Sequence, residues 1–205
     1  YRYIFVDEYQ DINDLQHSIV QELYRYATQL MVVGDEAQNI YSFRKSSSKY
    51  IRDFEKYFPD RPVERTALMV NYRSSTSIIN VANDVLSNMN TTIPVMKSHL
   101  DVSSELAPGG PIISVKHCDT FKQEIQHIVH SILTLLSNRD RDETIVVLSR
   151  INMSLYKIEE ALIHANVPYQ FIAKNHQCKD NTPVSLSTIH SSKGLEWDHV
   201  FIIGM

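Results

Sequence analysis

Short apolar runs alternate along the chain with stretches in which apolar residues recur every three or four positions. The run at residues 3–6 ends abruptly at two adjacent acids, a pattern that predicts a buried parallel strand. Asn13 or Asp14 then caps a predicted helix. One face of that helix is expected to be apolar, through Leu15, Ile19, Leu23 and Ala27. A second predicted strand at residues 30–33 completes a strand–helix–strand order, which is typical of an α/β fold.

The same alternation continues beyond a break at residues 59–62. A strand-like segment at residues 68–70 leads into a helix that is expected to begin at Ser74 or Ser75. The apolar face predicted for this helix consists of Ile78, Ala82, Val85 and Met89. Residues 90–111 are polar and include a Pro-Gly-Gly-Pro sequence, so we expect a loop or linker there.

The C-terminal half repeats the α/β pattern. Strands are expected at residues 112–115, 145–148 and 169–172, then from residue 184 and at residues 200–204. Two helices are expected between them, with apolar faces formed by Phe121, Ile125, Ile128, Ile132 and Leu135, and by Leu155, Ile158 and Leu162. No catalytic group of residues is recognisable in the two helices, and their histidines are expected on the surface or in the core.

Composition narrows the class of protein. The 205 residues suffice for one large or two small globular units, and 43% hydrophobic with 21% charged residues is typical of a soluble protein. No apolar run approaches the roughly 20 residues that cross a bilayer, and no signal segment is recognisable. Cys118 and Cys178 lie far apart, which favours a reducing compartment. The net charge of −4 excludes a chain-wide basic field, so contact with nucleic acid needs a local surface.

The two acids after the first strand are the first candidates for chemistry. In open α/β sheets, ligands bind outside the carboxyl ends of the strands, where Asp7 and Glu8 would stand. Successive side chains on a strand point to opposite faces, so these acids are expected to differ in role. One could hold a divalent metal, and the other could polarise a water as general base. Alternatively, both acids face solvent or cap the next helix.

Three later stretches also mix polar and aromatic residues at strand ends. In residues 34–44, Gln38 could contact a terminal phosphate or an attacking water, and the aromatic residues could stack on unpaired bases or pack in the core. Tyr72 could stack on a purine, and Arg73 offers a rigid donor fork for phosphate; alternatively, Tyr72 packs in the core and Arg73 is an ordinary surface residue. In residues 184–198, hydroxyl side chains could donate to backbone phosphates, or form only a capping turn.

The order of these stretches resembles the UvrD/Rep type of superfamily 1 DNA helicases. Asp7-Glu8-Tyr9-Gln10-Asp11 resembles motif II of that family, and residues 34–44 resemble motif III. Asn71-Tyr72-Arg73-Ser74-Ser75 resembles motif IV, and residues 188–197, Thr-Ile-His-Ser-Ser-Lys-Gly-Leu-Glu-Trp, resemble motif V. The resemblance implies RecA-like parallel sheets with flanking helices. Residues 1–68 would be the C-terminal part of domain 1A, and residues 69–205, with the loop at 90–111, would be most of domain 2A.

The resemblance also implies a role for each matching residue. Glu8, Gln38 and Arg73 would be catalytic: Glu8 would activate the hydrolytic water, Gln38 would sense the γ-phosphate, and Arg73 would reach it from the second domain. The nucleotide, ATP, would be bound by Asp7, Gln10, Tyr72 and Glu196, with Asp7 holding Mg²⁺. Single-stranded DNA would be bound by Tyr41, Phe43, Arg44, Thr188 and His190.

As a whole, the resemblance predicts an ATP-dependent helicase or translocase that moves 3′ to 5′ on single-stranded DNA. Such an enzyme would serve DNA repair or replication inside a prokaryotic cytoplasm, a nucleus or a viral factory, without a membrane partner. A non-motor ATP- or DNA-binding scaffold is the alternative. The joint presence of Glu8, Gln38 and Arg73 favours the motor, because a scaffold needs none of them together.

The chain departs from the family pattern in four places. Motif I, with its phosphate-loop lysine, and motif VI are absent, so we expect a piece of a longer protein that is inactive alone. Lys45-Ser46 stands where the family usually has Gly-Ala. The connection at residues 173–183 is short, which predicts that the 2B insertion is absent or vestigial.

Overall fold

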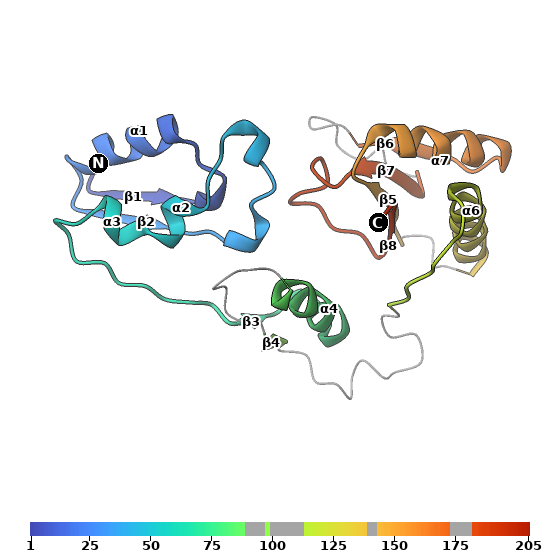
Figure 1. Cartoon of the computed structure of the whole chain (residues 1–205), viewed down its shortest axis with the longest axis horizontal. Helices are drawn as coiled ribbons and strands as arrows, with labels where there is room; N and C mark the ends of the chain where they lie inside the picture. The colour runs from blue at the N-terminus through green and yellow to red at the C-terminus, as the bar shows by residue number, and fades with distance from the viewer. Residues whose placement is uncertain (89–96, 99–112, 139–142, 173–181) are drawn as a thin grey trace. The chain divides into compact units, whose positions relative to one another are not determined.

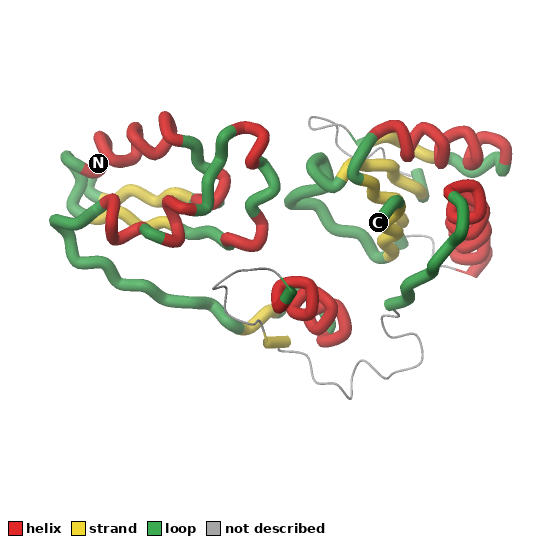
Figure 2. The backbone as a smooth tube through the Cα atoms, in the orientation of Figure 1, coloured by secondary structure: helices red, strands yellow, loops and turns green. Residues whose placement is uncertain are grey.

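The computed structural model describes residues 1–88, 97–98, 113–138, 143–172 and 182–205 (Figure 1). Contacts divide the chain into an N-terminal unit, Tyr1–Val115, and a C-terminal unit, Lys116–Met205. Both units contain parallel strands and accompanying helices (Figure 2), which confirms the predicted α/β fold of the RecA-like type. The domain boundary after residue 68 stays a prediction. Among the described residues, no helix is both long and apolar enough to cross a membrane.

The N-terminal unit begins with the predicted strand–helix–strand order. Strand β1 (Tyr3–Val6) pairs in parallel with β2 (Gln29–Val32), and Val6 lies opposite Val32 at the carboxyl end. Helix α1 (Asp14–Tyr24) connects them. The 3₁₀ turns are η1 (Tyr9–Asp11), η2 (Glu36–Gln38) and η3 (Ser42–Arg44), and the later elements are α2 (Lys49–Arg52), α3 (Phe54–Tyr57), β3 (Val70–Asn71), α4 (Thr76–Ser87) and β4 (Lys97–Ser98).

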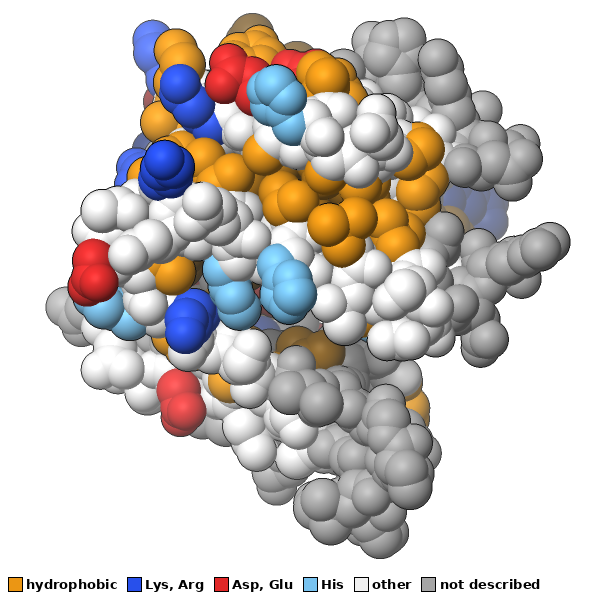
Figure 3. Space-filling view, turned by 90° about the vertical axis from the view of Figure 1, so that its right-hand side faces the viewer, with side chains coloured by type: hydrophobic (Ala, Val, Ile, Leu, Met, Phe, Trp, Pro, Cys, Tyr) orange, Lys and Arg blue, Asp and Glu red, His pale blue; other side chains and the backbone are white. Residues whose placement is uncertain are grey.

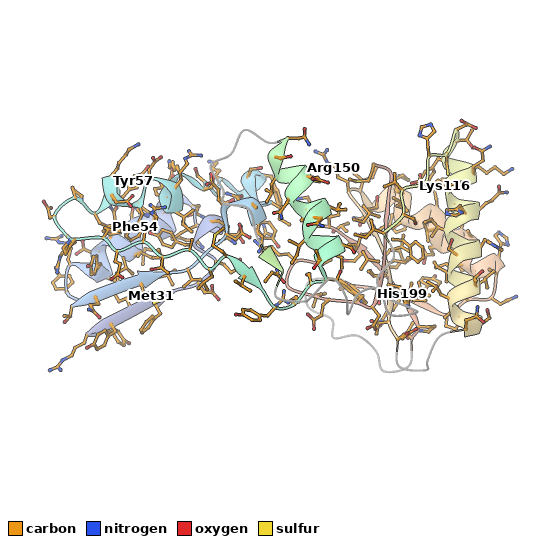
Figure 4. All side chains as sticks on the ribbon, turned by 90° about the horizontal axis from the view of Figure 1, so that it is seen from below. Met31, Phe54, Tyr57, Lys116, Arg150 and His199 are labelled. Atoms are coloured by element: carbon orange, nitrogen blue, oxygen red, sulfur yellow. The ribbon has the colours of Figure 1, made fainter. Side chains whose placement is uncertain are left out.

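The expectation that the first strand is buried was wrong. Tyr3 and Phe5 are 58% and 73% exposed, and Met31 of β2 is 55% exposed. Only the opposite face of this two-stranded sheet packs against the helices, through residues such as Val6 and Val32. In Figure 4, Phe54 and Tyr57 lie on the helix side of the sheet and Met31 on the other. The pairing of β1 is parallel as predicted, but its burial is one-sided in the residues described.

The buried face predicted for the first helix was also wrong. Asn13 caps α1 as expected, because its side chain accepts from the Gln16 N–H and the Gln16 side chain accepts from the Asn13 N–H. However, the helix buries His17 and Val20. Three residues of the predicted face, Leu15, Ile19 and Leu23, are exposed. The fourth, Ala27, is buried, but it follows the end of α1.

Helix α4 has its predicted start but a different buried face. Ser75 is its N-cap, and the Ser75 hydroxyl accepts from the Ile78 N–H. Ile79 is 2% exposed, whereas Ile78 and Val85 of the predicted face are 46% and 59% exposed. The short strand β4 falls inside the predicted linker, and the rest of residues 90–111 lies outside the described residues, as does Met89.

An aromatic cluster explains why α1 turns His17 inward. The His17 ring stacks on Tyr50 at a centroid distance of 3.9 Å, and Tyr57 and Phe58 meet it edge-on. Its Nδ1 shares a 2.9 Å hydrogen bond with the Tyr9 hydroxyl. Its Nε2 is buried and has no hydrogen-bond partner within the described ranges. Burial, aided by the charge of Lys49, lowers the pKa of His17 below its ordinary value of 6.5.

The N-terminal unit should therefore lose stability as the pH falls below about 6.5. The unfolded chain gains a proton on His17 there, whereas the folded chain gains it only at lower pH, so the free energy of unfolding falls by at most about 1.4 kcal/mol per pH unit between the two pKa values. The Asp14 carboxyl faces this cluster and its pKa is lowered, so its own loss of stabilisation comes only at lower pH. Hydrogen exchange of the α1 amides between pH 7.5 and 5 measures the slope.

A His17→Phe variant should flatten that slope, because phenylalanine keeps the stacking and does not titrate. His130→Gln is the matched control, since His130 is an exposed histidine of the other unit. An unchanged slope in His17→Phe would assign the pH dependence to another group.

The C-terminal unit is organised around one parallel sheet. Its four strands follow the order β6 (Tyr169–Phe171), β7 (Val184–Thr188), β5 (Ile145–Ser149) and β8 (His199–Ile203). Helices α6 (Phe121–Asn138) and α7 (Asn152–His164) flank it. These elements confirm the predictions for residues 121–172, for the strand from residue 184 and for the one near residue 200. The strand expected at residues 112–115 is absent from the described part, where Val115 is 96% exposed loop.

The core of this unit lies between the two helices and one face of the sheet. Leu155, Ile158 and Leu162 of α7 are fully buried, as predicted. They pack with alternate residues of the central strands and with α6, in a cluster that contains Ile128, Ile132, Ile145, Val147, Val184, Leu186 and Ile203. Some apolar residues of the helices are exposed, among them Leu133 and Ile163. Figure 3 shows hydrophobic side chains and histidines gathered on the face that it draws. The predicted short connection at residues 173–183 lies almost wholly outside the described residues.

Candidate functional site

The carboxyl ends of β1 and β2 bring two of the predicted motifs together. The Val33 N–H donates to the Val6 carbonyl, and the Tyr9 N–H donates to the Val33 carbonyl, both at 2.9 Å. The acid turn that follows β1 is thereby joined to the start of the loop that follows β2. An open cavity of about 1140 Å³ has Asp7 and Glu8 in its lining. This is the predicted position for ligand-binding residues of an α/β sheet.

The backbone of the acid turn separates the two carboxylates. Glu8 has φ 53° and ψ 41°, a left-handed conformation that L-residues with side chains seldom adopt. The Asp7 carboxylate accepts the Glu8 N–H at 2.8 Å. Both acids are exposed. Asp7 thus braces the turn through one oxygen, and strain of this kind is concentrated at functional sites.

Gln10 connects the acid turn to the second loop. The residue is fully buried. Its side-chain Nε2 donates to Glu8 Oε2 at 2.5 Å, and its Oε1 accepts the Asp35 N–H at 2.9 Å. The Gln10 backbone carbonyl accepts from the side chain of Asn39 at 2.9 Å. The Gln10 side chain was predicted to bind the nucleotide; here its amide contacts protein groups, and that prediction is untested.

Asp35 orients the turn that carries Gln38. One Asp35 oxygen accepts the Ala37 N–H, and the other accepts from Gln38 Nε2, both at 2.9 Å. Gln38 itself is exposed at the edge of the same cavity as Asp7 and Glu8. The structure therefore brings Asp7, Glu8 and Gln38 to one edge of the sheet. Asp35 was not among the predicted site residues, although its place after a strand and a glycine resembles that of Asp7.

The predicted DNA-binding residues of this loop form an aromatic group with one cation. The rings of Tyr41 and Phe43 meet edge-on with centroids 6.0 Å apart. The Arg44 guanidinium lies 5.2 Å from the Tyr41 ring centroid and 5.5 Å from that of Phe43. Phe43 is 64% exposed, which argues against simple core packing. An exposed ring beside a guanidinium suits stacking on an unpaired base.

The loop tolerates Lys45-Ser46 in place of the family's usual Gly-Ala. Lys45 has φ 61°, a left-handed backbone conformation. Glycine adopts this conformation without a steric penalty, whereas for other residues it is less favourable by roughly 1–2 kcal/mol. Ser46 is buried, and its hydroxyl donates to Asn39 Oδ1 at 3.0 Å. Asn39 also donates to Gln10, so the serine supports the same hydrogen-bond network. Asn39 and Ser46 belong to the site's supporting structure, which the sequence did not indicate beyond the departure from the family pattern at Lys45-Ser46.

Tyr72 and Arg73 lie in a turn between β3 and α4. The Asn71 side-chain oxygen accepts the N–H groups of Arg73 and Ser74, at 3.0 and 2.8 Å. This arrangement holds the turn while both predicted side chains are exposed, Tyr72 at 71%. Both side chains could therefore contact a ligand bound beside this turn.

In the C-terminal unit, the carboxyl end of β7 carries the fourth motif. Thr188 ends the strand opposite Ser149 of β5, and the Ile189 N–H donates to the Ser149 carbonyl. The Thr188 side-chain oxygen accepts the Ser191 N–H at 3.2 Å. Gly194 follows with φ 84°. His190 is partly buried and Glu196 exposed within this turn.

One exposed basic residue near this turn was missed from the sequence. Arg150 follows Ser149 directly at the end of the central strand β5 (labelled in Figure 4). The register places Ser149 opposite Thr188 on one side and Ile203 on the other. The sequence signal that could have identified Arg150 is its position directly after a strongly apolar strand.

Comparison with known proteins matches nearly the whole chain to one family. Residues 1–59 match the model of the UvrD/REP helicase N-terminal domain, and residues 66–176 and 172–205 match that of the UvrD-like helicase C-terminal domain. The ATP-dependent DNA helicase PcrA of Leuconostoc citreum is 34% identical over 173 residues, which are 84% of this chain and 22% of that protein. The ATP-dependent DNA helicase UvrD2 of Mycobacterium tuberculosis is 34% identical over 170 residues, which are 83% of this chain and 24% of that protein.

The chain therefore spans less than a quarter of the length of these curated relatives. Its matches to the N-terminal and C-terminal models follow one another in the family's order. The motifs that carry the resemblance, from Asp7 to Glu196, all fall within the matched residues. The chain belongs to the UvrD/Rep-type family of superfamily 1 helicases.

Proposed function

We propose that this chain is part of an ATP-dependent DNA helicase or translocase that moves along single-stranded DNA in the 3′-to-5′ direction. The observation that carries the proposal is the junction of the acid turn with the second loop, where Gln10 and Asp35 link Glu8 to Gln38. Nucleotide hydrolysis needs a base for the water and a group that senses the terminal phosphate. The family relatives bear the name ATP-dependent DNA helicase.

On the nucleotide side, Glu8 would accept the proton of the attacking water and Gln38 would contact the γ-phosphate. Mg²⁺ usually binds through one or two carboxylates, with water and phosphate oxygens completing the shell. Asp7 fits that requirement, because it is an exposed carboxylate at the carboxyl end of β1. In the described residues no group of three or more His, Cys, Asp or Glu side chains is arranged to hold a metal. A shell completed by phosphates does not require such a group.

A second set of residues would complete the nucleotide site from domain 2A, which we assign to residues 69–205. Arg73 would donate to the γ-phosphate, Tyr72 would stack on the adenine, and Glu196 would accept from the ribose. All three side chains are exposed. An arginine that reaches across to the triphosphate would make closure of the two domains depend on the nucleotide state.

The DNA strand would be held by stacking and by contacts with its backbone. Tyr41, Phe43 and Arg44 offer flat faces and one cation, as their ring and guanidinium distances support. Thr188 and His190 would meet the strand at the end of β7. These contacts do not read base identity, so binding should depend on salt and little on sequence.

The proposal predicts hydrolysis of ATP that increases when single-stranded DNA is added. The protein to use is the complete polypeptide that contains this sequence, and the measurement is phosphate release with and without a poly(dT) oligonucleotide. We expect the 205-residue chain alone to give no DNA-stimulated release. A complete protein that binds single-stranded DNA but releases no phosphate would support the scaffold function and overturn the motor.

A further inference from the structure

We propose that Gln10 is a positioning residue for hydrolysis, which holds the Glu8 carboxylate in register with the loop that carries Gln38. The inference rests on the proposed function and deepens it. It assigns Gln10 a role toward its protein neighbours in place of direct contact with the nucleotide. The side chain is fully buried, and both of its polar ends are used within the protein.

The hydrogen bonds give Gln10 a fixed orientation. Its Nε2 is the donor to Glu8 and its Oε1 is the acceptor for the Asp35 N–H. Exchanging the two ends of the amide would face Nε2 toward an N–H and Oε1 toward a carboxylate, and both pairs would repel. The orientation follows from the partners, and the Glu8 carboxylate accepts from the N–H donor end of the amide.

The absence of a side chain at Gly34 lets the second loop approach the Gln10 amide closely. A Cβ atom placed on Gly34 would lie 2.4 Å from Gln10 Oε1 and 2.8 Å from Ile51 Cδ1. It would also lie 3.1 Å from the Tyr9 backbone nitrogen. Gly34 thus allows the second loop to approach the acid turn closely enough for the Asp35 N–H to reach Gln10. Close backbone approach of this kind is a reason for glycine that sequence alone does not reveal.

The contacts form a continuous path between the two predicted catalytic groups. From Glu8 the path runs through the Gln10 amide to Asp35, whose carboxylate then accepts from Gln38. A displacement of the Gln38 turn is therefore transmitted to the acid turn through one buried side chain. Neighbours that orient a reacting group commonly change activity by roughly 10- to 100-fold when they are replaced.

The first test replaces Gln10 by methionine, which has a similar length and no hydrogen-bond donor. In the complete protein we expect kcat for ATP to fall by roughly 10- to 100-fold while KM changes less than twofold. Gln21→Met is the matched control, because Gln21 also donates from its side chain, to the Tyr57 carbonyl, but lies away from the acids. That control should keep kcat within twofold even if it lowers the melting temperature equally.

The second test is Gln10→Glu, read as a pH profile. A carboxyl at this buried position has a raised pKa, so its neutral form keeps a donor toward Glu8 and an acceptor toward Asp35. The kcat of Gln10→Glu should approach that of the unmodified protein at low pH and fall as the pH rises through that pKa. The unmodified protein should show no such fall in this pH range. Because ionisation of a buried carboxyl also destabilises the fold, the melting temperature is followed over the same range, and a fall in kcat while the variant stays folded supports the positioning role.

The outcomes separate this inference from the proposed function. If the unmodified protein hydrolyses ATP and Gln10→Met keeps its kcat, the positioning role is overturned and the motor stands. If Gln10→Met raises KM and leaves kcat unchanged, Gln10 contributes to nucleotide binding, and the positioning role is also overturned. If the unmodified protein hydrolyses no ATP, the proposed function and this inference both fail.

Discussion

A Glu8→Gln variant of the complete protein is expected to lose ATP turnover by roughly 10²- to 10⁴-fold, the usual contribution of a positioned general base. Glutamine keeps the size of the side chain but cannot accept a proton from water. Nucleotide binding should persist, because the exposed Asp7 carboxylate that would hold Mg²⁺ is unchanged. Single-turnover hydrolysis and binding of a fluorescent ATP analogue measure the two quantities separately.

The matched control for Glu8→Gln is Glu36→Gln in the second loop. Glu36 lines the same cavity, but its carboxylate pairs with Arg52 at 3.0 Å. Its neutralisation should change turnover less than threefold, since the pair is partly exposed and such pairs contribute about 0–1 kcal/mol. Equal turnover in Glu8→Gln and the unmodified protein would remove Glu8 from the proposed mechanism.

The parts of the fold that could be predicted from sequence are those whose burial is decided locally. Leu155, Ile158 and Leu162 share one helix face, and all are fully buried, because α7 covers a sheet within its own unit. In α1 the same periodicity gave a wrong prediction, because it favours the apolar Leu15 over the polar His17 as a core residue. His17 is buried instead because four aromatic rings surround it, one from Tyr9 before the helix and three from later segments, and periodicity carries no information about those partners.

The candidate site shows the same division between local and long-range information. The acids could be placed at a ligand-binding edge, because an apolar run that ends in Asp7 and Glu8 indicates the end of a parallel strand. The role of Gln10 could not be predicted, since its partner Asp35 lies 25 positions away and the contact depends on Gly34. Resemblance named Gln10 as a motif residue, and only the geometry shows which groups its amide contacts.

The C-terminal unit should depend strongly on the core residue Leu155. Leu155→Ala removes a fully buried side chain from the cluster between α7 and the sheet, and such truncations cost about 2–5 kcal/mol. Urea unfolding followed by tryptophan fluorescence measures the loss. The sequence contains one tryptophan, and it is Trp197 of the C-terminal unit, so the signal reports on that unit.

Ile163→Ala on the same helix is the control for Leu155→Ala. Ile163 is 55% exposed, so its truncation removes little buried area and should shift the free energy of unfolding by less than about 1 kcal/mol. The difference between the two variants isolates burial from helix propensity, because both place alanine in α7. Equal shifts would mean that burial in this core does not account for the cost of Leu155→Ala.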